Sequence, residues 1–324
     1  MGRRSKDKRD IYYRKAKEVG FRARSAYKLL QLDEQFNLFG ENVSKVVDLC
    51  AAPGSWSQVV SKRMAELNKL HLDTTRIVAV DLQEMAPIPG VNIIQGDITK
   101  EETIRQIVET FHGVTQKPGH SLDEERDPEN SIMFRRQDPD SLADLVISDG
   151  APDVTGVHDI DAYIQSELIL AALNVVLKLL REGGSFVAKV FRQKDTDLLY
   201  GRLKVFFHQV YIAKPKSSRN SSIEAFVVCK EFKLPEGYIA DTCIEYDPTR
   251  NKALIDHPSN VNRCLVPFVA CGDLSGFDSN MSYDLSSEDE LDHEPLMPVQ
   301  PPINPPYMEA KQKMREKYEQ PRNR

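Results

Sequence analysis

The sequence predicts an α/β protein whose core is a mostly parallel, doubly wound sheet with helices on both faces. The first observation behind this is that short apolar segments alternate with segments of helical periodicity between residues 44 and 207. The second is that acidic residues follow several of the apolar segments, at the sheet edge where ligands bind in such folds. We therefore expect a ligand site at the carboxyl ends of the strands.

The predicted elements follow one another in the order that this fold needs. Strands are predicted at 44–50, 76–81, 91–95, 143–149 and 184–191, and helices at 22–36, 55–67, 101–111, 161–180 and 195–207. The helix at 161–180 has the broadest apolar stripe, and we expect Gly183-Gly184 to end it. Val205–Ala213 and Ile223–Cys229 have no helix between them, so they are predicted to close the seven-stranded sheet as an antiparallel pair.

Composition favours an intracellular protein with no membrane segment. With 324 residues and 40% hydrophobic content, the chain can bury one sizeable core. No run approaches eighteen apolar residues, and Met1-Gly-Arg-Arg-Ser-Lys lacks the apolar stretch of a signal peptide. Five cysteines without a C-x-x-C pair suggest neither a disulfide framework nor a zinc site. We expect a cytoplasmic location; a nuclear presence is also compatible with this composition.

The nine residues Asp48-Leu-Cys-Ala-Ala-Pro-Gly-Ser-Trp56 join a predicted strand to a predicted helix. Gly54 has no Cβ, so a ligand can approach the first turn of the helix, where unpaired N–H groups favour a carboxylate or phosphate. A nicotinamide dinucleotide would use the same kind of sheet. One glycine cannot clear the space that the three of a G-x-G-x-x-G loop provide, which opposes that ligand.

This loop resembles motif I of the FtsJ/RrmJ family of S-adenosylmethionine-dependent RNA 2′-O-ribose methyltransferases. The resemblance covers roughly residues 5–230 and keeps the family's motif order. Its further segments are Ser25-Ala-Tyr-Lys28, Val80-Asp81-Leu, Gly96-Asp97-Ile, Ser148-Asp149-Gly-Ala-Pro-Asp153, Phe186-Val-Ala-Lys189 and Ser217-Ser-Arg-Asn-Ser-Ser-Ile-Glu224. It implies a Rossmann-like seven-stranded methyltransferase sheet, mostly parallel with an antiparallel last strand.

The resemblance implies S-adenosylmethionine as the cofactor. By it, Asp81 binds the ribose of the cofactor, as an acid ending the second strand of a doubly wound sheet can. Asp97 and Ile98 resemble the pair that reads the adenine amino group and covers its ring. Gly54 and Trp56 are predicted at the methionine end, Trp56 through its backbone or else as an ordinary core aromatic. Asp48 could line the same end or serve only the turn.

Four ionisable residues complete the predicted site by resemblance: Lys28, Asp149, Lys189 and Glu224. The ribose 2′-hydroxyl is a poor nucleophile at neutral pH, so the enzyme must align it and remove one proton. Lys189 is the predicted base. To accept a proton it must be neutral, which partial burial and a second ammonium nearby favour. Lys28 could supply that charge or could hold the substrate, while Asp149 and Glu224 orient the lysines and oppose the neutral form. Asp149 is also predicted at the cofactor, and no metal is required.

The first 28 residues are strongly basic, although the whole chain has a net charge of −6. Eleven basic residues stand there against three acidic ones, with Tyr12, Tyr13, Phe21 and Tyr27 interleaved. Such charge binds phosphates, and the rings offer stacking faces to bases. A solvated face is the plainer interpretation; beside this core we favour RNA binding.

The chain is expected to divide into a core and several appendages. The predicted parts are a basic RNA-binding segment at 1–28, a methyltransferase domain at 22–232 with an acidic loop insertion at 113–142, a partly ordered extension at 233–272, and an acidic, proline-rich disordered tail at 273–324. Residues 263–271 are apolar enough to pack on the core. A short helix at 311–317 is expected only on a partner.

Three segments resemble the eukaryotic cytosolic subgroup that acts on tRNA anticodon loops. They are Gly2-Arg-Arg-Ser-Lys-Asp-Lys-Arg-Asp-Ile-Tyr-Tyr-Arg, Ala-Pro-Asp-Val-Thr-Gly156 and Cys271-Gly-Asp-Leu-Ser. The resemblance implies methylation of the first anticodon nucleotide and the position two before it, positions 34 and 32. It also implies two separate partners, a large helical-repeat protein and a WD-repeat protein.

Other functions stay open at this point. A ribosomal-RNA 2′-O-ribose methyltransferase would use the same chemistry, although it would be expected to work without the acidic tail. A catalytically silent RNA-binding scaffold would need none of the four ionisable residues. Methylation of a small molecule or a protein is disfavoured by the basic, aromatic N-terminus.

Overall fold

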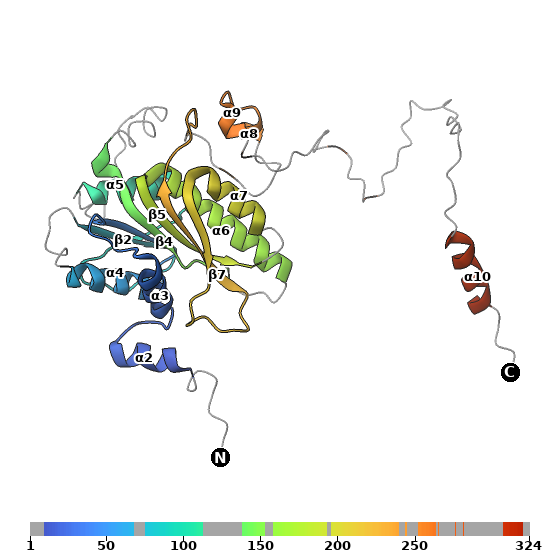
Figure 1. Ribbon diagram of the computed structural model, residues 1–324, viewed down its shortest axis with the longest axis horizontal. Coiled ribbons are helices and arrows are strands. Elements are labelled where there is room, and N and C mark those ends of the chain that lie inside the picture. Colours follow the sequence, from blue (N-terminus) through green and yellow to red (C-terminus); the bar gives the residue numbers. More distant parts are fainter. Residues whose placement is uncertain are drawn as a thin grey trace, which may run out of the picture. The chain divides into compact units, whose positions relative to one another are not determined.

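A seven-stranded sheet forms the centre of this computed structural model (Figure 1). The structure describes residues 10–67, 75–112, 138–152, 158–192, 196–239, 244, 252–263, 265, 276, 281 and 307–319. By its internal contacts the chain divides into two compact units, Met1–Gly272 and Asp273–Arg324, and the sheet belongs to the first.

The strands lie in the spatial order β3-β2-β1-β4-β5-β7-β6. Their bounds are β1 Lys45–Leu49, β2 Arg76–Asp81, β3 Asn92–Gln95, β4 Ala143–Ser148, β5 Leu180–Phe191, β6 Phe207–Ala213 and β7 Glu224–Phe232. Neighbours from β3 to β5 run parallel, whereas β7 is antiparallel to both β5 and β6. The predicted fold class is confirmed, including the antiparallel last strand.

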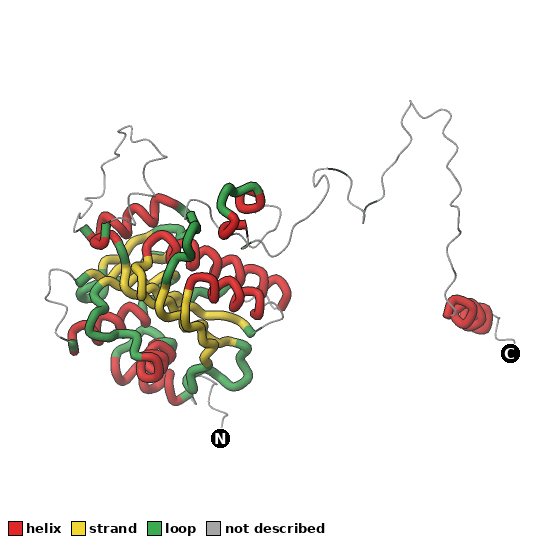
Figure 2. The backbone as a smooth tube through the Cα atoms, turned by 45° about the horizontal axis from the view of Figure 1, so that its top comes forward, coloured by secondary structure: helices red, strands yellow, loops and turns green. Residues whose placement is uncertain are grey.

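Helices cover both faces of the sheet (Figure 2). Their bounds in the first unit are α2 Ile11–Val19, α3 Ala26–Phe36, α4 Ser55–Glu66, α5 Glu101–Phe111, η3 Pro139–Ser141, α6 His158–Leu179, α7 Thr196–Phe206, α8 Lys252–Ile255 and α9 Asn260–Arg263. Helices α5, α6 and α7 share one buried apolar cluster with the sheet, and α3 and α4 share another.

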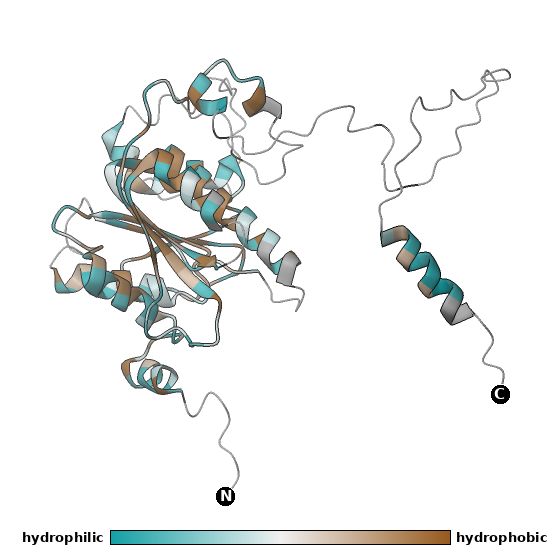
Figure 3. Cartoon of the chain, turned by 45° about the vertical axis from the view of Figure 1, so that its right-hand side comes forward, coloured by the Kyte–Doolittle hydropathy of each residue, from teal (hydrophilic) through white to brown (hydrophobic). Residues whose placement is uncertain are grey.

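Successive strand residues supply opposite faces, as the pleat requires. In β1, Val47 joins the cluster with α6, while Val46 joins the cluster with α4. The sheet is accordingly mostly apolar, as its brown colour in Figure 3 shows. A sheet buried on both faces leaves its edges as the places where polar groups can gather.

The glycine pair Gly183-Gly184 does not end helix α6, contrary to expectation. The helix ends at Leu179, and strand β5 begins at once with Leu180. The register of β4 against β5 shifts there, because Ala143 pairs with Leu180 but Leu145 pairs with Ser185. Gly183 has a φ of +74°, which only glycine adopts easily, so the pair serves an irregularity in the strand.

The predicted helix at 22–36 is shorter than expected, since α3 begins at Ala26. Before it lies α2, capped by the Asp10 carboxylate, which accepts from the N–H groups of Tyr12 and Tyr13. Gly20, with a φ of +85°, ends this helix.

Parts of the extension after β7 pack on the core. Tyr238, Ile244, Leu254 and Leu265 are all buried in the cluster that contains α6. In addition, the Asn174 side chain of α6 donates to the Ile244 carbonyl at 2.9 Å and accepts from its N–H at 2.9 Å. Leu265 thus lies in the core, while most of the apolar segment 263–271 is outside the described residues and its packing stays a prediction.

Two predicted regions lie largely outside the described residues. Residues 113–137 of the predicted insertion are among them, while 138–142 include the short helix η3. Most of the predicted disordered tail is also outside. In the second unit, α10 spans Tyr307–Glu319, so a helix is present over the predicted 311–317. Its dependence on a partner stays a prediction.

Candidate active site

The four predicted ionisable residues meet at one edge of the sheet. Lys28 comes from α3, Asp149 follows β4, Lys189 lies in β5, and Glu224 opens β7. Because β7 runs antiparallel to β5, its first residue lies at the edge where β4 and β5 end, and Glu224 pairs in register with Phe191. The topology thus explains how residues separated by almost 200 positions converge.

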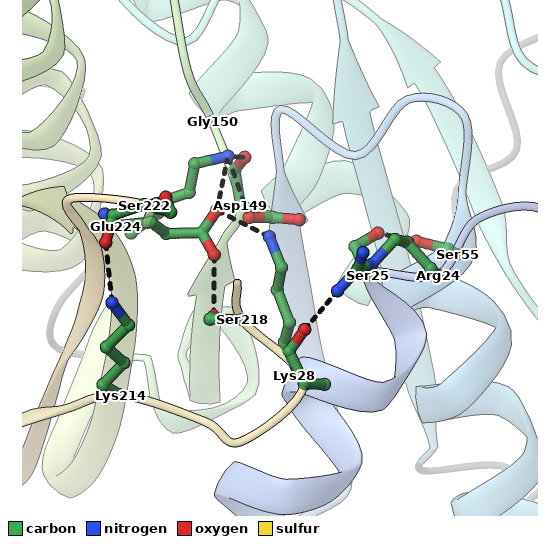
Figure 4. A network of polar contacts seen from close by, with 12 residues as sticks. Arg24, Ser25, Lys28, Ser55, Asp149, Gly150, Lys214, Ser218, Ser222 and Glu224 are labelled. Atoms are coloured by element: carbon green, nitrogen blue, oxygen red, sulfur yellow. Dashed lines mark hydrogen bonds and ion pairs between the residues drawn. The ribbon is translucent and has the colours of Figure 1, made fainter. Parts of the chain in front are cut away.

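Their charged atoms form a chain of contacts (Figure 4). Lys189 Nζ lies 3.1 Å from Asp149 Oδ1 and donates to the Asp149 backbone oxygen at 2.9 Å. Lys28 Nζ lies 2.6 Å from Glu224 Oε2, and Lys189 Nζ lies 3.9 Å from that same oxygen. Two lysine nitrogens therefore lie within 3.9 Å of one carboxylate oxygen. Each of the four side chains keeps between 11% and 18% of its surface exposed, so solvent or substrate can reach them.

The loop before β7 holds Glu224 in place. Ser218 is buried, and its hydroxyl donates to Glu224 Oε1 at 2.8 Å. Ser217 N–H donates to the Gln31 side chain of α3 at 2.8 Å, which ties the loop to the helix that carries Lys28. Sequence reasoning did not find Ser218 as a contact of the site, since one serine among four in this loop carries no distinguishing signal.

Glu224 is held in its charged form. Burial alone would raise the pKa of this carboxyl, but the Lys28 ammonium, the hydrogen bonds from Lys28 and Ser218, and the Lys189 charge outweigh it and lower the pKa overall. Glu224 is therefore an anion at neutral pH that binds both lysines.

The predicted cofactor loop lies beside this cluster. Its Cys50 has a φ of +54°, and a Cβ on Gly150, the residue after Asp149, would lie 3.0 Å from Cys50 Sγ. Burial raises the pKa of the Cys50 thiol to about 12, so it stays protonated. Gly54 has a φ of +99°, and a Cβ there would lie 2.7 Å from Ile88 Cδ1. The positive φ and the close Ile88 and Arg22 side chains favour glycine here, while contact of Gly54 with a ligand stays a prediction.

Asp48 lies under the loop and is completely buried. Its Oδ2 accepts from the Ser57 hydroxyl at 2.5 Å, whereas Oδ1 has no hydrogen-bond partner among the described residues. Burial is the main cause that raises the pKa of this carboxyl to about 7, and the nearby charges of Asp149 and Asp81 add to it. A turn role would need only the bond to Ser57, so the second oxygen is available to another group.

Asp81 and Asp97 follow the neighbouring strands β2 and β3. Asp81 accepts from the N–H groups of Ala52 and Gln83, both at 2.8 Å, which uses one lone pair on each oxygen. Asp97 accepts from Thr99 N–H and hydroxyl, and these bonds, the backbone one first, lower its pKa. Ile98 beside it is buried. Asp97 is thus held as an anion, and both carboxylates keep acceptor capacity for a ligand.

Leu82 is a residue that sequence reasoning missed. It directly follows Asp81 and leaves 68% of its surface exposed at the carboxyl end of β2. An exposed leucine on its own means little. Its position next to a strand-end acid is a signal that the sequence contained.

The indole of Trp56 does not face a ligand. It is 2% exposed, packs against Phe226 with ring centroids 5.6 Å apart, and donates from Nε1 to the Ser25 carbonyl at 3.0 Å. The alternative of a core aromatic is therefore correct for the side chain. Only the backbone N–H of Trp56, in the first turn of α4, remains for a ligand.

Two arginines counted in the basic N-terminal segment bind the protein itself. Arg22 Nη1 donates to Pro53 O at 2.9 Å, and its Nη2 donates to Ala86 O and Pro87 O at 2.8 and 2.9 Å. Arg24 bonds to Ser217 O and pairs with Asp10. The aromatic residues also meet one another, since Tyr27 contacts both Tyr12 and Phe21. The charge available for RNA is therefore smaller than the sequence count suggests.

Neither metal chemistry nor a membrane segment is suggested by the part of the chain that the structure describes. No group of three or more His, Cys, Asp or Glu side chains there is arranged to hold a metal ion. Among the helices described, none is long and apolar enough to cross a membrane.

Asp81 ends β2, Asp97 follows β3, a glycine turn follows β1, and two lysines and two carboxylates meet at the carboxyl edge of this Rossmann-like sheet. Such a site is typical of a methyltransferase. Residues 21–232 match the FtsJ-like methyltransferase family, and the chain belongs to that family. It is 51% identical to the human tRNA (cytidine(32)/guanosine(34)-2′-O)-methyltransferase over 96% of this chain and 84% of the human one.

Two further relatives differ in how much of the chain they match. The tRNA (cytidine(32)/guanosine(34)-2′-O)-methyltransferase of Schizosaccharomyces pombe is 47% identical over 96% of each chain. An AdoMet-dependent rRNA methyltransferase of Yarrowia lipolytica is 38% identical over 71% of this chain and only 23% of its own length. The relatives named for tRNA thus match the regions outside the catalytic domain as well.

Proposed function

We propose that this chain transfers a methyl group from S-adenosylmethionine to the ribose 2′-hydroxyls of tRNA anticodon-loop nucleotides 32 and 34. The observation that carries the proposal is the convergence of Lys28, Asp149, Lys189 and Glu224 directly beside the strand ends that carry Asp48, Asp81 and Asp97. A scaffold protein would gain nothing from such a cluster.

The residues present fit S-adenosylmethionine. The buried Asp48 Oδ1 has no partner among the described residues, and α4 has no side-chain cap on its first turn, so an acceptor and N–H donors are both available near Gly54. Asp81 keeps lone pairs for ribose hydroxyls, Asp97 for an amino group, and Leu82 and Ile98 offer apolar contact to a ring. When bound there, the cofactor supplies a methyl group activated by a sulfonium centre.

Lys189 is the proposed base, accepting the proton of the 2′-hydroxyl at Nζ. Asp149 fixes the position of that nitrogen through two contacts, and Glu224 does so from the other side. Both carboxylates stabilise an ammonium. The Lys28 ammonium lies closer to the shared Glu224 oxygen than Lys189 does, and it neutralises part of the charge of that carboxylate. It also holds hydrogen-bond donors for the substrate close to Lys189 Nζ.

The choice of tRNA is supported by relatives that match 96% of this chain and are named for positions 32 and 34 of tRNA. An exposed anticodon loop presents unstacked bases and accessible riboses, which suits recognition by charge and stacking. Exposed Lys214, Lys216 and Arg219 lie in the loop before Glu224 and add to the charge around the site. We also propose a cytoplasmic location and two separate partners, one a helical-repeat and the other a WD-repeat protein.

The experiment is a map of ribose 2′-O-methyl groups on total RNA from cells with and without this chain. We expect the methyl groups at tRNA positions 32 and 34 to disappear without it, while ribosomal RNA keeps its own. Unchanged tRNA would refute the assignment, and a loss confined to ribosomal RNA would favour the alternative substrate. RNA binding by the purified chain without any change in methylation would favour a scaffold.

A further inference from the structure

Gln165 of helix α6 bonds to the backbone of both strands that carry Asp149 and Lys189. Its side chain is buried, with 2% of the residue exposed. Nε2 donates to the Lys189 carbonyl at 2.8 Å and to the Gly150 carbonyl at 3.2 Å. One of these carbonyls belongs to the proposed base itself, and the other to the residue that follows its carboxylate partner.

The two bonds lie where the sheet ladder stops. Strands β4 and β5 pair in parallel up to Ser148 and Ala188, and no pairing continues beyond that position. Asp149 and Lys189 are the next residues on each strand, so they lie just past the last register pair of β4 with β5, and on its other side Lys189 pairs with Phe226 of β7. Buried carbonyls require a donor. The Gln165 amide donates one hydrogen bond to the backbone after β4 and one to β5, and so links the two chain segments beyond their last register pair.

The orientation of this amide follows from its neighbours. Both contacts are carbonyl oxygens, which can only accept, so the NH₂ group must face them. The Gln165 Oε1 atom is then buried without a hydrogen-bond partner among the described residues. Leaving a buried acceptor unpaired is costly. A glutamine at this position is therefore explained by its two donated bonds.

We propose that Gln165 is a positioning residue that sets the distance between Lys189 Nζ and the Asp149 carboxylate. It touches neither substrate nor cofactor. Without it, the strand ends separate, the contacts of 2.9 and 3.1 Å lengthen, and the Lys189 amine is no longer held where the 2′-hydroxyl loses its proton. The effect on catalysis rests on the proposed function, whereas the effect on the Lys189–Asp149 pair does not.

Gln165→Met tests this with a side chain of similar length that donates no hydrogen bond. On total tRNA from cells lacking this chain, we expect kcat to fall about tenfold or more, because catalysis is sensitive to small misplacements. The KM values for S-adenosylmethionine and for tRNA should stay within about twofold, since Gln165 contacts neither binding region. Partial unfolding would also lower the apparent kcat at unchanged KM, so kcat is expressed per folded protein, with the folded fraction taken from thermal unfolding.

Asn174→Leu is the matched control. Asn174 lies on the same helix and also bonds a backbone carbonyl and N–H, but those belong to Ile244 in the extension. This variant should unfold at a lower temperature while the remaining folded protein keeps its kcat. A loss of kcat in Gln165→Met no larger than in Asn174→Leu, at equal folded fraction, would overturn the proposal.

Gln165→Glu adds a signature in pH. A protonated glutamic acid can still donate one hydrogen bond, whereas its anion would face two carbonyl oxygens. The ratio of its kcat to that of the parent protein should therefore rise as pH falls. A ratio independent of pH would contradict the bonding role.

A measurement without any substrate separates this proposal from the proposed function. Crystal structures of the free variant proteins give the distances from Lys189 Nζ to the Asp149 backbone oxygen and to Asp149 Oδ1. These distances should lengthen beyond 2.9 and 3.1 Å in Gln165→Met and stay in place in Asn174→Leu. Unchanged distances refute the positioning role; lengthened distances in a protein that methylates no RNA support it and refute the function alone.

Discussion

Two aspartates at opposite ends of strand β4 show what distinguishes a structural carboxylate from a functional one. Asp144, near the start of the strand, accepts from Ser44 N–H at 2.6 Å, from Lys45 N–H at 2.8 Å and from the Ser44 hydroxyl, and it pairs with Arg181. Asp149, just past the end, contacts Lys189 through one oxygen and keeps twice the side-chain exposure, 18% against 9%. Asp144 binds four protein donors, two of them backbone N–H groups, whereas Asp149 leaves room for a reaction.

The comparison shows that the number of protein donors bound to a carboxylate identifies the site better than its residue type does. Both ends of the sheet gather charged residues, and both contain lysine–aspartate pairs. At the amino end, Asp144 binds two backbone N–H groups, which are fixed by the fold, in addition to a hydroxyl and an arginine. At the carboxyl end the donors are ammonium groups on flexible side chains, which can exchange protein partners for a substrate.

The largest expected effect comes from exchanging each aspartate for its amide. Asp149→Asn should reduce kcat on the order of 10²-fold or more, because the amide no longer orients the lysine base, while the unfolding temperature changes little. Asp144→Asn should leave kcat intact and cost about 1–3 kcal/mol of stability, since buried donors lose a charged acceptor. Steady-state kinetics and thermal unfolding on both proteins check this; a catalytic loss in Asp144→Asn would break the comparison.

A smaller effect is expected at Arg22, whose guanidinium binds three backbone carbonyls although it lies at the carboxyl edge of the sheet. Its guanidinium ties the cofactor loop at Pro53 to the segment Ala86-Pro87. Arg22→Ala should raise the KM for S-adenosylmethionine ~10-fold, the equivalent of about one net hydrogen bond. Arg14→Ala, on the exposed side of α2, should instead weaken RNA binding and leave that KM unchanged. Equal loss of RNA affinity in both variants would show that Arg22 acts as a phosphate contact.

The smallest effect concerns Asp48, of which only one carboxylate oxygen has a hydrogen-bond partner among the described residues. Its pKa is about 7 in the folded protein against an ordinary 3.8, so the folded state holds a proton that the unfolded state releases. The stability contributed by this proton is complete below pH 3.8 and is lost as pH rises to about 7.

Asp48→Asn removes this titration. Its unfolding temperature relative to the parent protein should therefore rise with pH up to about 7 and then level off. Thermal unfolding of the cofactor-free proteins between pH 5 and pH 8 measures the difference. A difference that does not vary with pH would mean that Asp48 titrates elsewhere.

The fold class and the meeting of Lys28, Asp149, Lys189 and Glu224 could be predicted because each is tied to a local signal. The carboxyl ends of parallel strands share one edge, and the motifs state which residues stand there. The helix ends were less predictable. Gly183-Gly184 lie in an irregular part of strand β5 and not at the end of a helix. The register of β4 against β5 determines this irregularity, and no local sequence pattern indicates that register.

The supporting contacts could not be read from the sequence. Gln165, Arg22 and Ser218 act on residues up to 65 positions away, and their type alone suits a surface position equally well. Trp56 was ambiguous for the same reason, since its indole partner Ser25 lies 31 positions away. Long-range packing fixed these roles.

The central claim is that the carboxyl edge of the sheet performs the methyl transfer and the amino edge does not. The most direct test compares Lys189→Ala with Lys45→Ala, since Lys45 pairs with Asp140 at the opposite edge. Ribose methyl groups are mapped on total tRNA from cells that carry either variant at matched abundance. We expect the anticodon-loop methyl groups to be absent with Lys189→Ala and present with Lys45→Ala. Full methylation with Lys189→Ala would contradict the account.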